Sequence, residues 1–239
     1  MDLTHRAGVH AALGDPQRLQ IADALTVGDL TVSDIATLTN MPGNLLAHHL
    51  DVLEGAGVVE RRTSEGDRRR RYVVLNPTVA GLITHGSLAV DATPLFVCTA
   101  NSARSQFAAA LWQDRTGQPV ESAGSHPAEH VNPMAVAVAA DFGINLIAAT
   151  PSGYDEVVGT HDIVISVCDR AAESGIPFPE PHLHWSVPDP VPIGGVDAFI
   201  AAFTDITERV DRLLVEAPCW SRGRGPSSRW ASARPCSCG

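Results

Sequence analysis

The chain has 239 residues, a hydrophobic content of 44% and a formal net charge of -10 at pH 7, which suits one or two globular domains. No run reaches the roughly 18 apolar residues of a membrane span, and the N-terminus lacks the charged-then-apolar pattern of a secretion signal. We therefore expect a cytoplasmic protein with no membrane partner. Residues 91–217 carry 17 acidic residues and 5 arginines, a balance that disfavours nucleic-acid binding by this segment.

The first ninety residues predict short helices followed by a β-hairpin. Apolar spacing favours a helix within 11–25, with Asp15-Pro16 as a helix start, a second helix from residue 31, and a third over 44–55. Two strands, 58–63 and 68–75, then flank the polar turn Ser64-Glu65-Gly66-Asp67. A helix–turn–helix followed by a hairpin is the outline of a winged-helix domain of the α+β class.

A winged-helix domain predicts contacts with double-stranded DNA. The second helix of the pair reads the major groove, and an arginine-rich hairpin can contact phosphates. The residues expected to contact DNA are Asn44, His48, His49, Arg68, Arg69, Arg70 and Arg71. Three alternatives stay open: the arginine run is only a solvated turn, the histidines contact no base, or the domain is a degenerate winged helix that binds a protein.

Three segments of this region, 12–19, 45–53 and 56–59, resemble the ArsR-type bacterial repressors, and the resemblance runs over residues 8–76. It implies operator DNA as a partner and a homodimer. Arsenite-sensing members of that family carry thiolates, because soft ligands suit soft metalloids. Residues 1–97 contain no cysteine, so either induction uses cysteines elsewhere or this domain answers to another signal.

The second half predicts a separate α/β domain of three layers with a parallel sheet. Alternating apolar segments indicate strands at 94–98, 120–123, 163–167 and 182–185 and helices at 105–116, 132–142 and 197–215. The predicted organisation is therefore a winged-helix domain over 1–85, a linker over 86–93, an α/β domain over 94–217 and a disordered tail over 218–239.

The most informative segment of the chain is the loop between the first of these strands and the first helix. Backbone N–H groups at a strand–loop–helix junction bind oxyanions, and the same field should lower the pKa of Cys98 and make its thiolate a nucleophile. Arg104 can clamp two anion oxygens, and Ser105 is expected to cap the helix and to hydrogen-bond the thiolate. The predicted oxyanion-binding residues are Thr99, Ala100, Asn101, Ser102 and Ala103.

Further downstream, Asp189 is a candidate general acid for the leaving oxygen. The alternative for Asp189 is an ordinary Asp-Pro turn, and the alternative for the loop is a buried structural cysteine beside an unrelated surface arginine.

Residues 94–216 resemble the low-molecular-weight tyrosine phosphatase superfamily, and more closely its arsenate reductase branch. The motifs that carry the resemblance are Cys98 to Gln106, Ser122-Ala123-Gly124-Ser125, Asn132-Pro133 and His184 to Pro190. Phosphatases of the family usually place a proline after Arg-Ser, where this chain has Gln106. The resemblance implies that Cys98 is the nucleophile and that Arg104 binds the oxyanion.

A second cysteine distinguishes the possible reactions. Arsenate reduction consumes two electrons, so a second thiol must act, and Cys168 lies where reductases with an internal relay have a cysteine. Their further cysteines are missing here, since Ala103 and Gly175 offer none. The remaining routes are a Cys98–Cys168 disulfide or attack by an external thiol. The reductant is then thioredoxin or a mycothiol/glutaredoxin-like system, with no bound cofactor. The alternative for Cys168 is a buried structural cysteine.

The tail carries three cysteines, Cys219, Cys236 and Cys238, which form a weak candidate metalloid site or are incidental; no firm metal site is predicted. The favoured function is an arsenate reductase fused to an arsenic-responsive DNA-binding repressor. Two alternatives stay open, a low-molecular-weight tyrosine phosphatase with a regulatory DNA-binding domain and a non-catalytic oxyanion-sensing regulator. Gln106 and Cys168 favour the reductase over the phosphatase.

Overall fold

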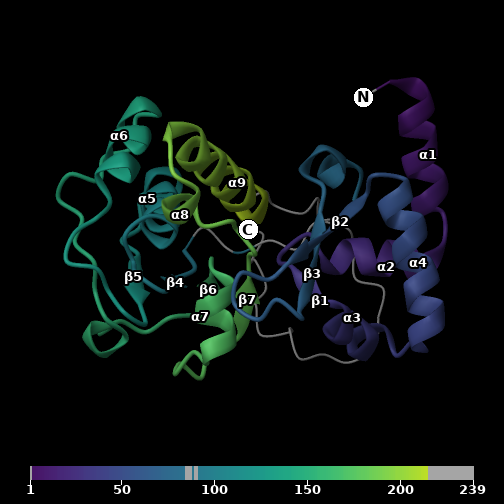
Figure 1. Cartoon of the computed structure of the whole chain (residues 1–239), viewed down its shortest axis with the longest axis horizontal. Helices are drawn as coiled ribbons and strands as arrows, with labels where there is room; N and C mark the ends of the chain where they lie inside the picture. Colours follow the sequence, from purple (N-terminus) through teal and green to yellow (C-terminus); the bar gives the residue numbers. More distant parts are fainter. Residues whose placement is uncertain (1, 84–87, 89–90, 215–239) are drawn as a thin grey trace, which may run out of the picture.

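The computed structural model describes residues 2–83, 88 and 91–214. They form two domains, with the hairpin of the first lying against the second (Figure 1). The predicted linker over 86–93 lies partly outside the described residues, and the predicted tail with its three cysteines lies entirely outside them.

The N-terminal domain is a winged helix, as predicted. Its elements are α1 (Leu3–Leu13), α2 (Pro16–Ala24), β1 (Leu30–Thr31), α3 (Val32–Thr39), α4 (Gly43–Gly55), β2 (Val59–Thr63), β3 (Arg71–Leu75) and the 3₁₀ helix η1 (Pro77–Leu82). The strands form an antiparallel sheet in the order β1-β3-β2. The β2–β3 hairpin and its turn, residues 59–75, are the wing.

Local capping explains where these helices begin and end. Asp15 accepts hydrogen bonds from two first-turn N–H groups of α2, and Pro16 occupies the first helical position. This is why the predicted 11–25 helix is divided, with residues 11–13 belonging to α1. Thr31 and Asp34 form a reciprocal capping box at α3, and Asn40 ends that helix in the left-handed conformation with φ 52°.

The C-terminal domain has a four-stranded parallel sheet, as predicted, in the order β5-β4-β6-β7. Its strands are β4 (Pro94–Cys98), β5 (Glu121–Gly124), β6 (Ile163–Ser166) and β7 (His182–His184). Its helices are α5 (Arg104–Thr116), α6 (Pro133–Asp141), η2 (Tyr154–Glu156), α7 (Asp169–Ser174), α8 (Pro190–Ile193) and α9 (Val196–Leu214).

Both faces of the central strand β4 are buried, as a parallel sheet between two helical layers requires. Phe96 packs with Trp112 of α5, at 6.2 Å between ring centroids, in the cluster that also contains the apolar side of α9. Leu95 and Val97 face the other way, in a separate cluster with Val164. Among the described helices, none is both long and apolar enough to cross a bilayer.

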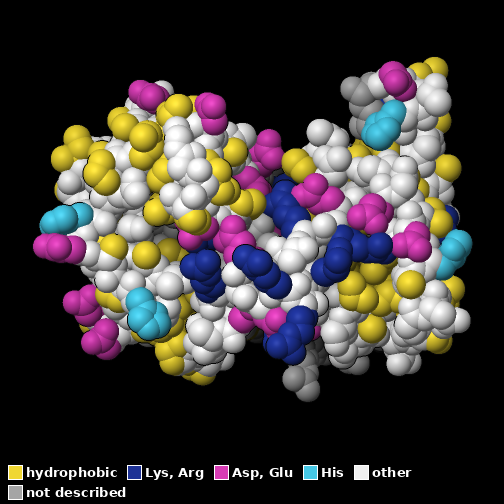
Figure 2. Space-filling view, in the orientation of Figure 1, with side chains coloured by type: hydrophobic (Ala, Val, Ile, Leu, Met, Phe, Trp, Pro, Cys, Tyr) yellow, Lys and Arg dark blue, Asp and Glu magenta, His cyan; other side chains and the backbone are white. Residues whose placement is uncertain are grey.

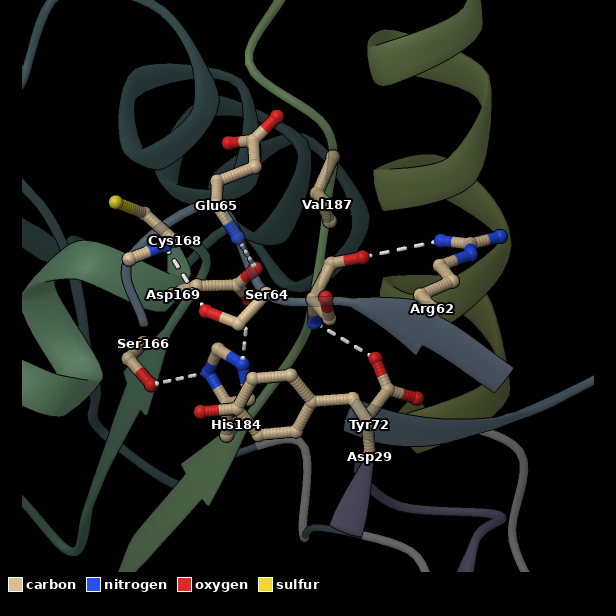
Figure 3. Close-up of polar contacts among 12 residues, drawn as sticks. Asp29, Arg62, Ser64, Glu65, Tyr72, Ser166, Cys168, Asp169, His184 and Val187 are labelled. Carbon is tan, nitrogen blue, oxygen red and sulfur yellow. Dashed lines mark hydrogen bonds and ion pairs between the residues drawn. The ribbon is translucent and has the colours of Figure 1, made fainter. Parts of the chain in front are cut away.

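A buried ion pair joins the two domains. The Asp29 carboxylate accepts the Ser186 N–H at 2.7 Å and pairs with the Arg209 guanidinium of α9 at 3.0 Å, with the two side chains 2% and 5% exposed. Next to this pair, Arg62 of the wing donates to the Ser186 carbonyl at 3.0 Å (Figure 3). On the surface, arginine and acidic side chains mingle over the boundary between the domains (Figure 2).

We expect Asp29→Ala to lower the free energy of unfolding by about 3 kcal/mol, because the buried Arg209 guanidinium keeps only Asp205 as a partner and the buried Ser186 N–H loses its acceptor. Denaturant unfolding followed by tryptophan fluorescence measures the change. The matched control is Asp51→Ala, which removes an exposed carboxylate paired with Arg61 and should cost less than about 1 kcal/mol. Equal effects of the two substitutions would contradict the importance of the buried pair.

Candidate active site

The predicted anion loop occupies the carboxyl edge of the parallel sheet, where open sheets of this class bind ligands. Strand β4 ends at Cys98 and helix α5 begins at Arg104, so residues 99–103 form the connection. The first N–H groups of a helix have no partner within the helix, and those of α5 therefore face the loop. This arrangement can hold a tetrahedral oxyanion.

Cys98 is almost fully buried, at 3% exposure. Its Sγ lies 3.0 Å from the Ser105 hydroxyl and accepts the Asn101 N–H at 3.1 Å. Burial, followed by the charge of the neighbouring Cys168, raises the pKa of the Cys98 thiol, while Arg104 and Ser105 act in the opposite direction. The expectation of a lowered pKa is therefore wrong for this conformation, because the site is desolvated more strongly than its sequence indicates.

Ser105 takes a different place from the one predicted. Helix α5 starts one residue earlier, at Arg104, and its N-cap position is Ala103, which makes no side-chain cap. Ser105 thus lies within the first turn, fully buried, where its hydroxyl contacts Cys98 and accepts a hydrogen bond from the Asn101 amide at 2.8 Å. Its predicted contact with the thiol is present, but its predicted role as a helix cap is not.

Asn101 holds the loop in shape. It adopts φ 47° and is completely buried, and a short polar side chain is the kind that tolerates this left-handed conformation. The side-chain NH₂ donates to the hydroxyls of Ser105 and Ser122, and the side-chain oxygen accepts from Gln106 and from the Ser152 N–H, all at 2.8–3.0 Å. One amide therefore connects the loop to β5 and α5.

The end of β5 must carry a glycine for the loop to fit. A Cβ at Gly124 would lie 2.6 Å from the Thr99 carbonyl oxygen and 3.0 Å from the Asn101 nitrogen. These are backbone atoms that cannot rotate away, so the glycine allows the loop to pack against β5. This contact explains the glycine of the Ser122-Ala123-Gly124-Ser125 motif in physical terms.

Arg104 and Asp189, both predicted as site residues, contact each other. An Arg104 Nη2–Asp189 Oδ2 distance of 2.8 Å makes an ion pair, and Arg104 also donates to the Val187 carbonyl at 2.8 Å. The guanidinium is 5% exposed. Asp189 also caps the short helix α8, so the Asp-Pro turn is real and places the carboxylate at the site.

Cys168 joins the same site from the end of β6. It is 1% exposed, lies at the N-cap of α7, and its sulfur is 3.2 Å from the Thr99 hydroxyl of the anion loop. Both described cysteines are free thiols. A second thiol beside the loop is the arrangement that a two-electron reaction needs.

All of the residues predicted to contact DNA are exposed except His49, which is buried. Asn44 and His48 are exposed on α4, and the arginines at 68–71 are exposed on the wing. His49 is instead 5% exposed, with Nε2 2.9 Å from the Gln17 side-chain oxygen. A DNA contact of His49 is therefore wrong in this fold, because its place on α4 turns it toward α2.

No group of three metal-binding side chains gathers within the described ranges, and Cys219, Cys236 and Cys238 lie outside them. Two residues of the site were not predicted. Gln106 supports the loop by donating to the Asn101 carbonyl at 3.1 Å; its unusual place after Arg-Ser was the available signal. Glu65 of the wing contacts Arg104 at 3.4 Å, and nothing local in the sequence indicates it.

Comparison with known proteins matches each half of the chain to a different family. Residues 94–218 match the family described as low molecular weight phosphotyrosine protein phosphatase, and residues 15–61 match the arsR family of bacterial regulatory proteins. The chain is 35% identical to an arsenate reductase of Halalkalibacterium halodurans, over 43% of this chain and 76% of that protein.

Two further relatives extend this result. An arsenate reductase of Bacillus licheniformis is 34% identical over 50% of this chain and 93% of that protein. The transcriptional repressor SdpR of Bacillus subtilis is 38% identical over 30% of this chain and 76% of that protein.

We expect alkylation of Cys98 to show an apparent pKa above the free-cysteine value of about 8.5, because burial outweighs Arg104 and Ser105. Ser105→Ala should raise this pKa further, since it removes a hydrogen bond that lowers it. Iodoacetamide labelling across pH, with Cys98 followed by mass spectrometry, measures both. An apparent pKa below that of free cysteine would contradict the argument from burial.

Proposed function

The chain belongs to the low molecular weight phosphotyrosine protein phosphatase family through residues 94–218 and joins to it a DNA-binding domain of the arsR family, and from this premise we propose that the second domain reduces arsenate to arsenite while the first controls transcription of arsenic-resistance genes. The observation that carries the enzyme proposal is the convergence of Cys98, Arg104 and Asp189 with a second thiol, Cys168, on one loop. A phosphatase has no use for that thiol.

In the proposed first step, the Arg104 guanidinium and the N–H groups of the loop bind arsenate. The Cys98 thiolate attacks the arsenic atom and forms a sulfur–arsenic bond. One arsenate oxygen leaves as water after receiving a proton, a role we propose for the protonated form of Asp189. Arg104 offsets the charge that accumulates on the oxygens during this displacement. Arsenic is still pentavalent at the end of the step.

In the second step, a further thiolate attacks the Cys98 sulfur. The sulfur–arsenic bond breaks and its electron pair stays on arsenic, which leaves as trivalent arsenite, while the two sulfurs form a disulfide. The position of Cys168 beside Thr99 supports it as the attacking thiol. The Cys98–Cys168 disulfide must then be reduced by an external dithiol, for which thioredoxin or a mycothiol/glutaredoxin-like system has the required chemistry.

The DNA-binding half of the proposal rests on the arsR match and on the surface of the winged helix. Asn44 and His48 are exposed on α4, the helix that reads the major groove in such domains. Exposed arginines on the wing supply positive charge for phosphates. We propose a homodimer on operator DNA, in keeping with the two-fold symmetry that helix–turn–helix dimers share with their sites.

We expect Cys168→Ser to lower arsenate turnover by about 100-fold or more but to change hydrolysis of an aryl phosphate by less than about threefold, because only the reduction consumes a second thiol. The assays use purified protein with a thioredoxin system for arsenate and p-nitrophenyl phosphate for hydrolysis. Cys98→Ser, which removes the nucleophile, should abolish both activities. Unchanged arsenate turnover in Cys168→Ser would mean that an external thiol attacks the Cys98 adduct directly.

Binding to non-specific duplex DNA should weaken with salt, and replacing Arg69 and Arg70 by Ala should reduce the slope of log K against log salt by about 2, since each arginine neutralises one phosphate. Fluorescence anisotropy across a salt series measures the slope. Arg115→Ala, on the far domain, is the control and should leave the slope unchanged. A slope unaffected by the double substitution would remove the wing from the DNA interface.

A further inference from the structure

The turn of the wing is bound to the α/β domain by hydrogen bonds from its own backbone. The Glu65 N–H donates to Asp169 at 2.8 Å, and the Asp67 N–H donates to Glu173 at 2.5 Å. The Ser64 hydroxyl also donates to Glu173, at 2.7 Å. The close-up shows the wing turn against the start of α7 (Figure 3). The turn of a DNA-binding domain is thus docked on two carboxylates of the other domain.

Both carboxylates are well suited to holding the turn. Burial alone would raise the pKa of Asp169, but hydrogen bonds from His184 and from the Glu65 N–H hold it below its ordinary value, so Asp169 accepts as a carboxylate. A Cβ at position 66 would meet the Glu173 carboxylate. Gly66 therefore lets the turn approach α7 closely.

The docked turn carries the Glu65 side chain to the anion site. Glu65 Oε2 lies 3.4 Å from Arg104 Nη1, and Glu65 Oε1 accepts the Asp189 N–H at 2.8 Å. A carboxylate presents two anionic oxygens to a guanidinium, as an arsenate or phosphate does. Glu65 therefore uses a guanidinium nitrogen that a bound oxyanion would need.

The negative charge around Arg104 opposes binding of an oxyanion while Glu65 is in place. Arg104 is the cation of the cluster, and it already faces the carboxylates of Asp189 and Glu65. An incoming oxyanion adds further negative charge within a few ångströms of both, where repulsion in a desolvated site is strong. Asp189 belongs to the same domain as the loop, whereas Glu65 is 30% exposed and reaches the site only through the docked turn.

The turn can leave without losing its own structure. The Gly66 N–H donates to the Ser64 hydroxyl and the Arg70 N–H donates to the Asp67 carbonyl, at 2.9 and 2.8 Å, all within the wing. The Asp169 carboxylate would keep His184 as a partner at 3.0 Å. Undocking therefore breaks the contacts of residues 64–67 with Arg104, Asp169, Arg170, Glu173 and Asp189, while these hydrogen bonds within each domain remain.

We propose that Glu65 is an internal competitor of the oxyanion for Arg104, so that a tetrahedral oxyanion enters the site only as Glu65 leaves and the wing turn undocks. The proposal rests on the proposed function for the placement of the oxyanion at Arg104. Linkage is reciprocal, so the factor by which docking of the turn weakens oxyanion binding equals the factor by which a bound oxyanion weakens docking. A change that loosens the docked turn therefore raises the affinity for the oxyanion. The occupancy of the anion site thereby sets the position of the wing.

Isothermal titration of the full chain with inorganic phosphate tests the competition. Glu65→Gln should bind phosphate at least about fivefold more tightly than the wild type, since the competing charge is gone. Glu173→Gln, which weakens the hold on the turn without touching Arg104, should also bind more tightly. Asp67→Asn is the matched control: it removes the same charge from the same turn, but its carboxylate contacts Arg69, so the affinity should stay within about twofold.

Amide hydrogen exchange reports whether the wing turn is docked. Saturating phosphate should speed amide exchange at Glu65 and Asp67 of the wild type, because their N–H groups lose the Asp169 and Glu173 acceptors. Equal phosphate affinity in wild type and Glu65→Gln, or binding that leaves this exchange unchanged, overturns the proposal. Phosphate binding without arsenate turnover would refute only the proposed reductase activity, whereas no binding to either protein would refute both.

Discussion

The geometry of the anion loop depends on the buried amide of Asn101. Its left-handed backbone turns the chain between Cys98 and α5, and its side chain engages Ser105, Ser122 and Gln106. A buried polar group of this kind is costly unless every donor and acceptor is satisfied, and here these three partners and the Ser152 N–H come from different parts of the domain. The thiol, its hydroxyl partner and the start of α5 are all placed through this one residue.

A second constraint extends from the loop to the other domain. The buried Arg209 guanidinium pairs with Asp29 and Asp205, and removing either carboxylate is costly. Arg62, near the turn end of β2, hydrogen-bonds the same interface. With this end of β2 fixed there, the turn reaches α7 and Glu65 reaches Arg104. The DNA-binding domain therefore completes the surroundings of the site instead of merely preceding it in the chain.

The burial of Cys98 and Arg104 has a chemical consequence. A desolvated thiol with a raised pKa is a poor nucleophile and resists oxidation, so burial protects Cys98 in this conformation. Arg104 already pairs with Asp189 of its own domain, and Glu65 adds a second carboxylate beside it. The docked wing therefore changes the charge around Arg104 in the resting protein.

Much of this organisation could be predicted from the sequence because it depends on residues close together in the chain. Asp15-Pro16 and Thr31 with Asp34 begin helices through local hydrogen bonds, and the strand–loop–helix of Cys98 to Arg104 is a contiguous motif. The parallel sheet and the winged helix followed from the order of apolar segments and turns. Asp189 was a candidate from its residue type, but its ion pair with Arg104 was not predicted.

Tertiary structure alone decided burial and the contacts between domains. The inward face of His49, the place of Ser105 inside α5 and the raised pKa of Cys98 depend on which surfaces pack together, and that information is spread over distant segments. The contact of Glu65 with Arg104 has no local signature, because a glutamate in a polar turn is ordinary until the turn is docked. Short-range hydrogen bonding and periodicity are encoded within a few residues, whereas desolvation and charge pairing across a domain boundary exist only once the whole chain is folded.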